Sequence, residues 1–374
     1  MSIQILGMVS TSYGSESAGW RGPVVDPGYL ADFARAHEEA GFDRALIAHS
    51  ATSPEGFAAA AHVLYTTERL GVLIAQRPGF IQPTLTARKL ATLDNLTGAG
   101  RVAIHHITGG SDADQRRDGD FASKDARYRR TGEFIDVLRR TLTSDEPFDH
   151  EGEFYRFEGA FSSVKPRGPV PIFFGGQSDD AIRVGGRWAD VYALWGEPLA
   201  QTRERIDLIR AEAARHGREI DFSLSVRPIV AETEDAAWEK ADGIRRAFED
   251  NLAQGGGGGG WRIGRGENTA VGARRLKDEA EEKLVHDERL WFGVTQLTDG
   301  GGNSTALVGT PQQVVEALLK YYDLGVRNFL IRGFDPLRDV REWGEELVPL
   351  LRAGAAARER DLVAAGAGQG RDAK

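Results

Sequence analysis

The sequence predicts an α/β fold, a single closed (β/α)8 TIM barrel that carries insertion segments. Short β-rich runs recur along the chain, a helical pattern follows each run, and several runs are almost continuously apolar. Parallel strands that are buried on both faces have this pattern. Alternation of strand and helix repeated eight times favours a closed barrel, and an open doubly wound sheet is the alternative.

Eight segments fit the strands of such a barrel. Each is rich in β-branched, aromatic or other apolar residues, and each precedes a helical pattern. In chain order they are Ile3–Ser10, Arg44–His49, Arg69–Gln76, Arg101–Thr108, Pro171–Gly175, Val191–Trp195, Phe222–Val230 and Asn328–Gly333. We expect one barrel domain that spans residues 1–352.

Helices are predicted by periodicity and by end signals. In Asp26–Gly41 apolar side chains recur at helical spacing, which predicts one buried stripe. The segment Thr310–Gln313 has the pattern of a capping box, with Pro311 in the first turn. Gly325 marks the end of the same helix, immediately before the last strand.

Two insertions interrupt the alternation of strands and helices. Glu146–Val164 is rich in aromatic residues and glycine and predicts a hairpin flap. Gln254–Thr305 is longer and contains six consecutive glycines, Gly255–Gly260. Because glycine runs lose much entropy on ordering, we expect a mobile lid over the catalytic face. A disordered surface insertion is the alternative.

Three further segments have predictable roles. Within the longer insertion, Val271–Glu288 predicts a helix and Leu290–Leu297 predicts a strand. Residues 353–374 are rich in alanine, glycine and charged side chains and predict a disordered tail. Asp94 and Arg101 are interpreted as a structural ion pair.

Composition limits the classes of function. The chain has 47 basic and 56 acidic side chains and a formal net charge of −9, which argues against nucleic acid or an anionic membrane as main partner. It has no cysteine, which excludes disulfides, thiolate metal sites and a cysteine nucleophile. The N-terminal segment lacks the pattern of a signal peptide, and no apolar run is long enough to span a bilayer, so we expect a cytoplasmic protein.

Catalytic residues of parallel barrels gather at the carboxyl ends of the strands. There the sequence places mainly hydroxyls, glycines, histidines and arginines, and few carboxylates. His105 and His106 are adjacent, so strand alternation sends them to opposite faces, which argues against a metal centre. Glu197 and Asp335 are the plausible carboxylates for a glycosidase, but Glu197 fits better as a helix-start residue.

The segment Phe173–Asp180 is more informative. An apolar strand turns through Gly175 and Gly176 into a helix that is opened by Ser178 and an aspartate. Exposed backbone N–H groups at such a helix start suit a phosphate. A Gly-Gly turn that only joins strand to helix is the alternative.

Eight short motifs follow one another along the chain. They are Ala75–Gly79, Leu90–Asp94, Gly100-Arg101, Ile107–Gly109, Arg127-Tyr128, Phe174–Gly176, Leu194–Pro198 and Thr305–Gly309. Together they resemble the bacterial luciferase-like flavin monooxygenases, and within that family the pattern is most similar to alkanesulfonate monooxygenase. The resemblance runs from about Ile3 to Leu351.

The resemblance implies a TIM barrel that binds FMNH2 delivered by a separate NAD(P)H-dependent FMN reductase. It implies that O2 adds to the flavin to give a peroxyflavin, which attacks the substrate, and that a sulfonate would yield an aldehyde and sulfite. It also implies that Tyr128 and the turn Gly175–Ser178, including Gly176 and Gln177, hold the FMN phosphate. The strand end from His105 to Thr108 would lie along the flavin ring.

The chain departs from the sulfonate enzyme at its reactive positions. Ser53 stands where that enzyme has a cysteine, and Ser12 stands where it has a histidine. The family's arginine and histidine on the seventh strand become Ser225 and Arg227, and its tyrosine after the last strand becomes Phe334. These differences change the cationic and proton-transferring set and leave the flavin chemistry intact.

Other side chains could replace the cationic and proton-transferring residues that the sulfonate enzyme has. We predict Arg227, Ser53 and His105 as the catalytic residues. Arg227 and Arg332, at the ends of neighbouring strands, could form a bidentate anion clamp. The alternative is that each arginine pairs with a structural carboxylate such as Glu232 or Asp335. The predicted substrate-binding residues are Ser12, Trp195, Arg332 and Phe334, and no metal-binding residues are predicted.

The sequence therefore predicts a two-component FMNH2-dependent monooxygenase that oxidises a small organosulfur substrate, an alkanesulfonate or a related sulfone. An F420-dependent oxidoreductase of the same superfamily and a non-catalytic flavin-binding protein are the alternatives. The family resemblance also implies a homodimer or homotetramer.

Overall fold

Eight parallel strands form a closed barrel in the computed structural model, as predicted. In spatial order they are β1 (Gln4–Val9), β4 (Arg44–Ile47), β5 (Gly71–Gln76), β6 (Val102–His106), β9 (Ile172–Gly175), β10 (Val191–Trp195), β11 (Asp221–Val230) and β15 (Val326–Ile331). Pairing of β10 with β11 and of β15 with β1 completes the ring. The structure describes residues 3–15, 17, 19–253, 270–302 and 304–369.

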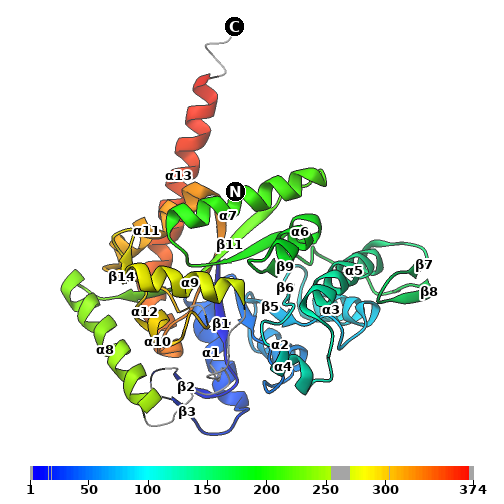
Figure 1. Cartoon of the computed structure of the whole chain (residues 1–374), viewed down its shortest axis with the longest axis horizontal. Helices are drawn as coiled ribbons and strands as arrows, with labels where there is room; N and C mark the ends of the chain where they lie inside the picture. Colours follow the sequence, from blue (N-terminus) through cyan, green and yellow to red (C-terminus); the bar gives the residue numbers. More distant parts are fainter. Residues whose placement is uncertain (1–2, 16, 18, 254–269, 303, 370–374) are drawn as a thin grey trace.

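Helices surround the strands (Figure 1). They are α1 (Pro27–Glu39), α2 (Gly56–Thr66), α3 (Pro83–Thr97), α4 (Asp112–Arg117), α5 (Lys124–Thr143), α6 (Asp179–Trp188), α7 (Leu199–Arg215), α8 (Glu234–Ala253), α11 (Pro311–Leu324), α12 (Pro336–Glu345) and α13 (Leu347–Gln369). The capping box at Thr310 is present as predicted, with Gln313 completing it. Gly325 ends α11 in the left-handed conformation, at φ 111°, which glycine adopts without steric cost.

The barrel interior is packed with side chains rather than open. Leu6, Leu73, Ala103, Phe173 and Val191 form a buried cluster that is contributed by five strands. Because successive side chains of a strand point to opposite faces, every second residue from these positions also faces inward. The alternate residues pack against the surrounding helices. This parity identifies the side chains that reach the carboxyl end of the barrel.

Two antiparallel hairpins extend from the barrel. β7 (Phe148–Glu151) pairs with β8 (Arg156–Ala160), which is the hairpin predicted for this segment. Glu133 of α5 anchors it, since its carboxylate accepts the backbone N–H groups of Phe154 and Tyr155 at 2.9 and 2.8 Å. A second hairpin, β2 (Tyr13–Ser15) with β3 (Gly19–Arg21), follows β1 and was not predicted.

The described part of the longer insertion is folded. It contains α9 (Val271–Glu282), β12 (Val285–His286), β13 (Leu290–Trp291) and α10 (Gly293–Leu297), and it leads into β14 (Ala306–Gly309). β14 pairs in parallel with the second half of β11, and β13 pairs antiparallel with β14. The glycine run Gly255–Gly260 lies outside the described residues.

Two predicted elements of this insertion are corrected. The strand predicted over Leu290–Leu297 covers only two residues, because the chain turns at Gly293 and continues as a helix. A Cβ atom at Gly293 would lie 2.0 Å from the Trp291 ring, so this turn needs a residue without a side chain. The helix predicted over Val271–Glu288 ends at Glu282.

The segment for which a disordered tail is predicted begins as a helix. After Arg352 the chain continues in α13 as far as Gln369 and projects away from the barrel (Figure 1). Alanine-rich sequence with arginine and leucine has high helix propensity, and Arg358 ties the helix to Asp323 and Glu316 of α11, each at 2.7 Å. Among the described residues, no helix is long and apolar enough to cross a membrane.

Asp94 is a buried junction between α3 and two loops. Its carboxylate accepts the backbone N–H groups of Gly100 at 2.7 Å, Arg167 at 2.6 Å and Gly168 at 3.1 Å. The ion pair interpreted between Asp94 and Arg101 is not formed. Arg101 instead donates to the carbonyl groups of nearby backbone.

Replacing Asp94 by Asn is expected to lower the free energy of unfolding by about 3 kcal/mol, because hydrogen bonds to a buried carboxylate are worth roughly 1.5–3 kcal/mol each and an amide can replace them only in part. Urea denaturation monitored by circular dichroism would measure the change. Asp207→Asn, at an exposed position of α7, is the matched control. Equal stabilities of the two variants would contradict the structural role of Asp94.

Candidate active site

The carboxyl ends of the strands bring several predicted residues to one end of the barrel. The inward positions there include His105 of β6, Gly175 of β9, Trp195 of β10 and Arg332 after β15. Two contacts confirm that these ends converge. A Cβ atom at Gly175 would lie 3.7 Å from His105 Cε1, and Arg332 Nη1 lies 3.6 Å from the Met8 sulfur of β1. This mouth of the barrel is the candidate active site.

His105 and His106 occupy opposite faces of β6, as predicted. His106 packs outward on Phe134 of α5, with ring centroids 5.2 Å apart. His105 faces the mouth, and its Nδ1 is buried without a hydrogen-bond partner. Burial lowers the pKa of His105 to about 4 and that of His106 to about 3. Both imidazoles are therefore neutral near pH 7, and His105 can exchange a hydrogen bond with a bound molecule.

A cradle forms where β9 turns into α6. Ser178 is the N-cap of α6, and its hydroxyl accepts the backbone N–H of Ala181 at 3.3 Å. A Cβ atom at Gly176 would lie 2.6 Å from Ala181 Cβ and 3.1 Å from the Tyr128 hydroxyl. The Gln177 side-chain oxygen is buried without a partner. The predicted residues Tyr128 and Gly175–Ser178 are thus brought together at a helix start, which suits a phosphate.

The insertion covers part of the mouth. A Cβ atom at Gly272 of α9 would lie 3.1 Å from Gln177 and 3.4 Å from the Trp195 ring, so α9 contacts both side chains. Arg332 donates a short hydrogen bond to the Gly302 carbonyl in the same insertion. The insertion therefore covers Trp195 and Arg332 in part.

Glu197 and Arg275 hold α9 in this position, and sequence reasoning missed the pair. The Arg275 guanidinium donates two hydrogen bonds of 2.9 Å to the Glu197 carboxylate, which is almost fully buried. Gln201 of α7 also donates to Glu279 of α9 at 2.9 Å. The two members of the pair are 78 positions apart, and no local sequence signal links them.

Arg227 and Phe334 lie under the insertion rather than in an open pocket. Arg227 is 1% exposed, its guanidinium stacks 4.4 Å from the Phe334 ring centroid, and it donates to the Gly333 carbonyl at 3.5 Å. Phe334 is also in edge contact with Phe248 of α8. Arg227 and Arg332 follow paired positions of β11 and β15, so their side chains leave neighbouring strands on the same face.

Three predicted residues take part in local contacts. The Ser53 hydroxyl donates to the Ser50 carbonyl at 3.0 Å and accepts the Ser50 N–H at 2.9 Å, which closes a loop after β4. The Ser12 carbonyl accepts a hydrogen bond from the Ser10 hydroxyl at 3.1 Å. Thr108 is buried, and its carbonyl accepts a hydrogen bond from Gln115 at 3.5 Å. These residues shape the loops at the mouth.

A second group that sequence reasoning missed lies beside β5. Arg77, which the sequence left without a defined partner, forms ion pairs with Asp114 and Asp118 at α4. With His49 it lines a cavity of about 40 Å³, room for about one water molecule. Among the described residues, no group of three or more His, Asp or Glu side chains is placed to hold a metal ion.

Comparisons with known proteins identify a family. The model of the family described as luciferase-like monooxygenase matches residues 5–328, which run from β1 into β15 and include both insertions.

Solved structures share the fold. A riboflavin lyase, solved with modified FMN and its substrate riboflavin, is 20% identical, with 94% of this chain and 92% of that chain covered and a TM-score of 0.74. EDTA monooxygenase from Chelativorans sp. BNC1 is 17% identical, with 94% of each chain covered and a TM-score of 0.72. An F420-dependent secondary alcohol dehydrogenase, solved with an F420–acetone adduct, is 17% identical, with coverages of 94% and 99% and a TM-score of 0.67. At these identities the likeness shows the fold alone.

The buried histidines make stability depend on pH. The folded-state pKa values of His37, His105 and His106, about 4, 4 and 3, lie below the ordinary value of 6.5 because burial disfavours the charged ring. The unfolded chain therefore binds more protons, so this stability is present above pH 6.5 and is lost as the pH falls toward 4. Urea unfolding between pH 7 and 4 should show that fall. His106→Leu should flatten it and His62→Gln, at the surface, should not; identical slopes in all three proteins would refute the assignment.

Breaking the pair between Glu197 and Arg275 should release α9. Arg275→Met leaves a buried carboxylate without its cation, and we expect amide hydrogen exchange across Val271–Glu282 to become about tenfold faster, since a partner that is 23% exposed reduces the roughly 3–5 kcal/mol cost of breaking a fully buried pair. Hydrogen-exchange mass spectrometry measures this directly. Lys277→Met, on the same helix, is the control, and equal exchange in both variants would show that the pair does not anchor α9.

Proposed function

The chain belongs to the luciferase-like monooxygenase family, and from this premise we propose that it is a two-component, FMNH2-dependent monooxygenase. Its substrate is a small organosulfur compound, an alkanesulfonate or a related sulfone, and the product is sulfite or sulfinate. A separate NAD(P)H-dependent reductase delivers the reduced flavin, as in the family that the sequence resembles.

The cradle between β9 and α6 carries the proposal. Its backbone at Gly176 comes so close to Tyr128 and Ala181 that a side chain there would collide with both. The N-terminus of α6 offers backbone N–H groups to a phosphate, and the Tyr128 hydroxyl adjoins the same point. The residues present therefore fit the phosphate end of FMN.

The neighbouring mouth fits the ring end. His105 and Gln177 each hold a buried polar atom without a protein partner, which a bound heterocycle could satisfy. Gly175 lies next to His105 and leaves space for a flat group. When bound, the reduced flavin supplies the electrons that activate O2, and one oxygen atom passes to the substrate. The role proposed for His105 is a hydrogen bond from its neutral ring, because its low pKa keeps it uncharged near pH 7.

The guanidinium groups of Arg227 and Arg332 are the reason to propose an anionic substrate. Arg227 and Arg332 leave neighbouring strand ends on one face of the barrel, and the Glu197 carboxylate nearby already binds Arg275. A sulfonate or sulfone oxygen would accept charge-assisted hydrogen bonds from such a pair. Trp195, with Ser12, Ser53, Thr108 and Phe334 around the same end of the barrel, forms the proposed surroundings of the substrate.

The insertion has a role in the same mechanism. α9 covers Trp195 and Gln177, and the loop at Gly302 contacts Arg332. Exclusion of water strengthens every charge interaction inside the mouth and suppresses unproductive oxidation of the flavin. We therefore propose that the described part of the insertion, residues 270–302, serves as a lid of the site.

An F420-dependent hydride transfer is the second candidate, because a protein of the same fold was solved with an F420 adduct. Turnover separates the two reactions. A monooxygenase requires O2 and consumes reduced FMN, whereas hydride transfer to F420 proceeds without O2.

The decisive assay supplies FMN, NADH and an FMN reductase in air with octanesulfonate and dimethyl sulfone, and it measures sulfite and sulfinate. We expect release that depends on substrate and O2, and loss of at least tenfold in kcat/KM for Arg332→Gln, because a charge-assisted contact is worth about 1.5–3 kcal/mol. No product with either substrate, together with turnover of reduced F420, would replace the proposed function by the second candidate.

The cradle can be tested by binding alone. Gly176→Val should weaken FMN binding by at least about tenfold, because the new side chain collides with Tyr128 and Ala181, which blocks the phosphate position. Quenching of flavin fluorescence gives the affinity. Gly217→Val, also at positive φ but with nothing within 4 Å of its Cβ position, is the matched control. Equal affinities of the two variants would remove the cradle as the flavin site.

A further inference from the structure

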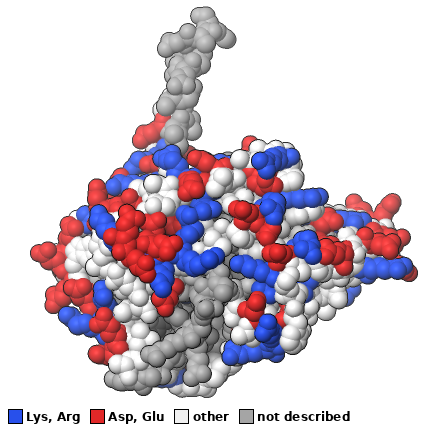
Figure 2. All heavy atoms as spheres, in the orientation of Figure 1, with Lys and Arg blue, Asp and Glu red and all other residues white. Residues whose placement is uncertain are grey.

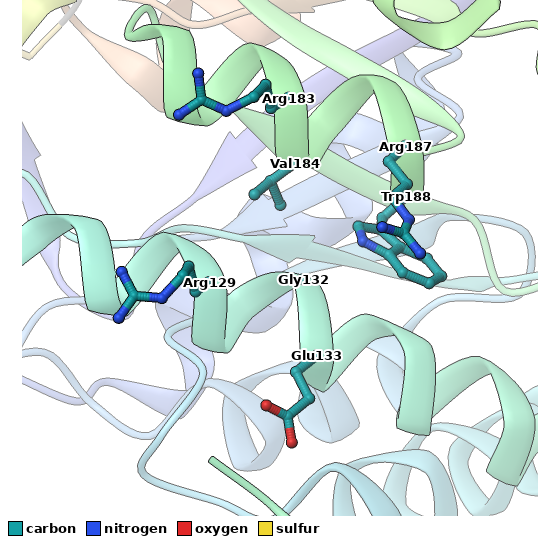
Figure 3. A pocket seen from close by; sticks show the side chains of 7 residues that line it. All are labelled: Arg129, Gly132, Glu133, Arg183, Val184, Arg187 and Trp188. Carbon is teal, nitrogen blue, oxygen red and sulfur yellow. The ribbon is translucent and has the colours of Figure 1, made fainter. Parts of the chain in front are cut away.

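A groove with a volume of about 290 Å³ lies between α5 and α6 on the outside of the barrel (Figure 3). Its floor is apolar and consists of Gly132 of α5 with Val184 and Trp188 of α6. A Cβ atom at Gly132 would lie 3.2 Å from the indole nitrogen of Trp188 and 3.9 Å from a Val184 methyl. The missing side chain at Gly132 therefore keeps the floor open beside the indole.

The rim of the groove is basic. Three arginines line it, Arg129 from α5 and Arg183 and Arg187 from α6, against one carboxylate, Glu133. Glu133 already accepts two backbone N–H groups and lies 3.0 Å from His150 Nε2, all from the hairpin of β7 and β8. The Glu133 carboxylate therefore interacts with the hairpin of β7 and β8. Figure 2 shows that basic and acidic side chains are otherwise interspersed over one face of this net acidic protein.

Arg187 is the member of this rim without a carboxylate. Arg129 binds Glu153 through two hydrogen bonds, and Arg183 binds Asp180. Within the described parts of the chain, no carboxylate lies within 4.0 Å of the Arg187 guanidinium, which instead stacks 4.7 Å from the Trp188 ring centroid. A bound anion would give Arg187 the counter-charge that it lacks.

We propose that this groove binds a small aromatic anion that carries one sulfonate or carboxylate group. The ring packs on Val184 and Trp188 above Gly132, and the anionic group accepts hydrogen bonds from Arg187, while Arg183 keeps its contact with Asp180. A guanidinium fork matches such oxygens geometrically, and a groove of this size lies at the small end of ligand sites. None of these residues belongs to the proposed flavin site, so the inference goes beyond the proposed function.

Isothermal titration calorimetry with naphthalene-2-sulfonate tests the proposal on the full chain. We expect saturable binding that weakens with added salt, and 2-naphthol, which shares the ring but is uncharged at neutral pH, should bind more weakly. Arg187→Gln should raise the Kd by about fivefold or more, because it removes a partly exposed charged contact. Arg215→Gln, at an exposed arginine of α7, is the matched control and should leave the Kd unchanged.

Further variants separate the groove from the barrel mouth. Gly132→Val fills the floor and should weaken naphthalene-2-sulfonate binding as Arg187→Gln does, while both variants keep the wild-type affinity for FMN. Binding that survives both substitutions but is lost in Arg332→Gln would place the anion at the mouth and overturn the proposal. Absence of saturable binding to the wild-type chain would overturn it as well.

Discussion

Alternation of side chains along eight parallel strands is the constraint on which the rest of the molecule depends. Every strand must fill two buried faces at once, the barrel interior and the contact with the helices. β6 shows the consequence within two residues, since His105 enters the mouth and His106 packs on Phe134. A shift of one residue in register would exchange these two rings and remove His105 from the mouth. The same alternation of side chains therefore determines both how the core packs and which residues reach the site.

The strands and the helix ends could be predicted because their signals are local. Continuous apolar runs define β5 and β9, and the capping box at Thr310 defines the start of α11 within four residues. The insertion could not be predicted in detail, since the need for glycine at position 293 depends on where the Trp291 ring lies in the folded chain. In α13 the composition of alanine and glycine does not specify the contacts of the first half of the helix, which Arg358 ties to α11.

The residues of the candidate site also differ in whether local sequence signals could predict them. The turn Gly175–Ser178 could be predicted from sequence because its glycines and the serine cap are contiguous, whereas Tyr128 was predicted only through the family resemblance. The contact between Arg275 and Glu197 and the one between Arg77 and Asp114 join segments far apart in the chain. No single stretch of sequence encodes such pairs, because each is specified by the folded barrel. Sequence reasoning could therefore predict the turn at Gly175–Ser178 and could not predict the contacts that hold α9.

β11 belongs to two sheets in succession. Its first half pairs with β10 and β15 inside the barrel, whereas from Arg227 to Val230 it pairs with β14. The insertion is thus joined to the barrel at one side by backbone hydrogen bonds and at α9 mainly by side chains. If the insertion moved, it would pivot about the paired strands β11 and β14, and α9 would move farthest. Arg227 lies where β11 pairs with β14, so its guanidinium would keep its position during such a movement.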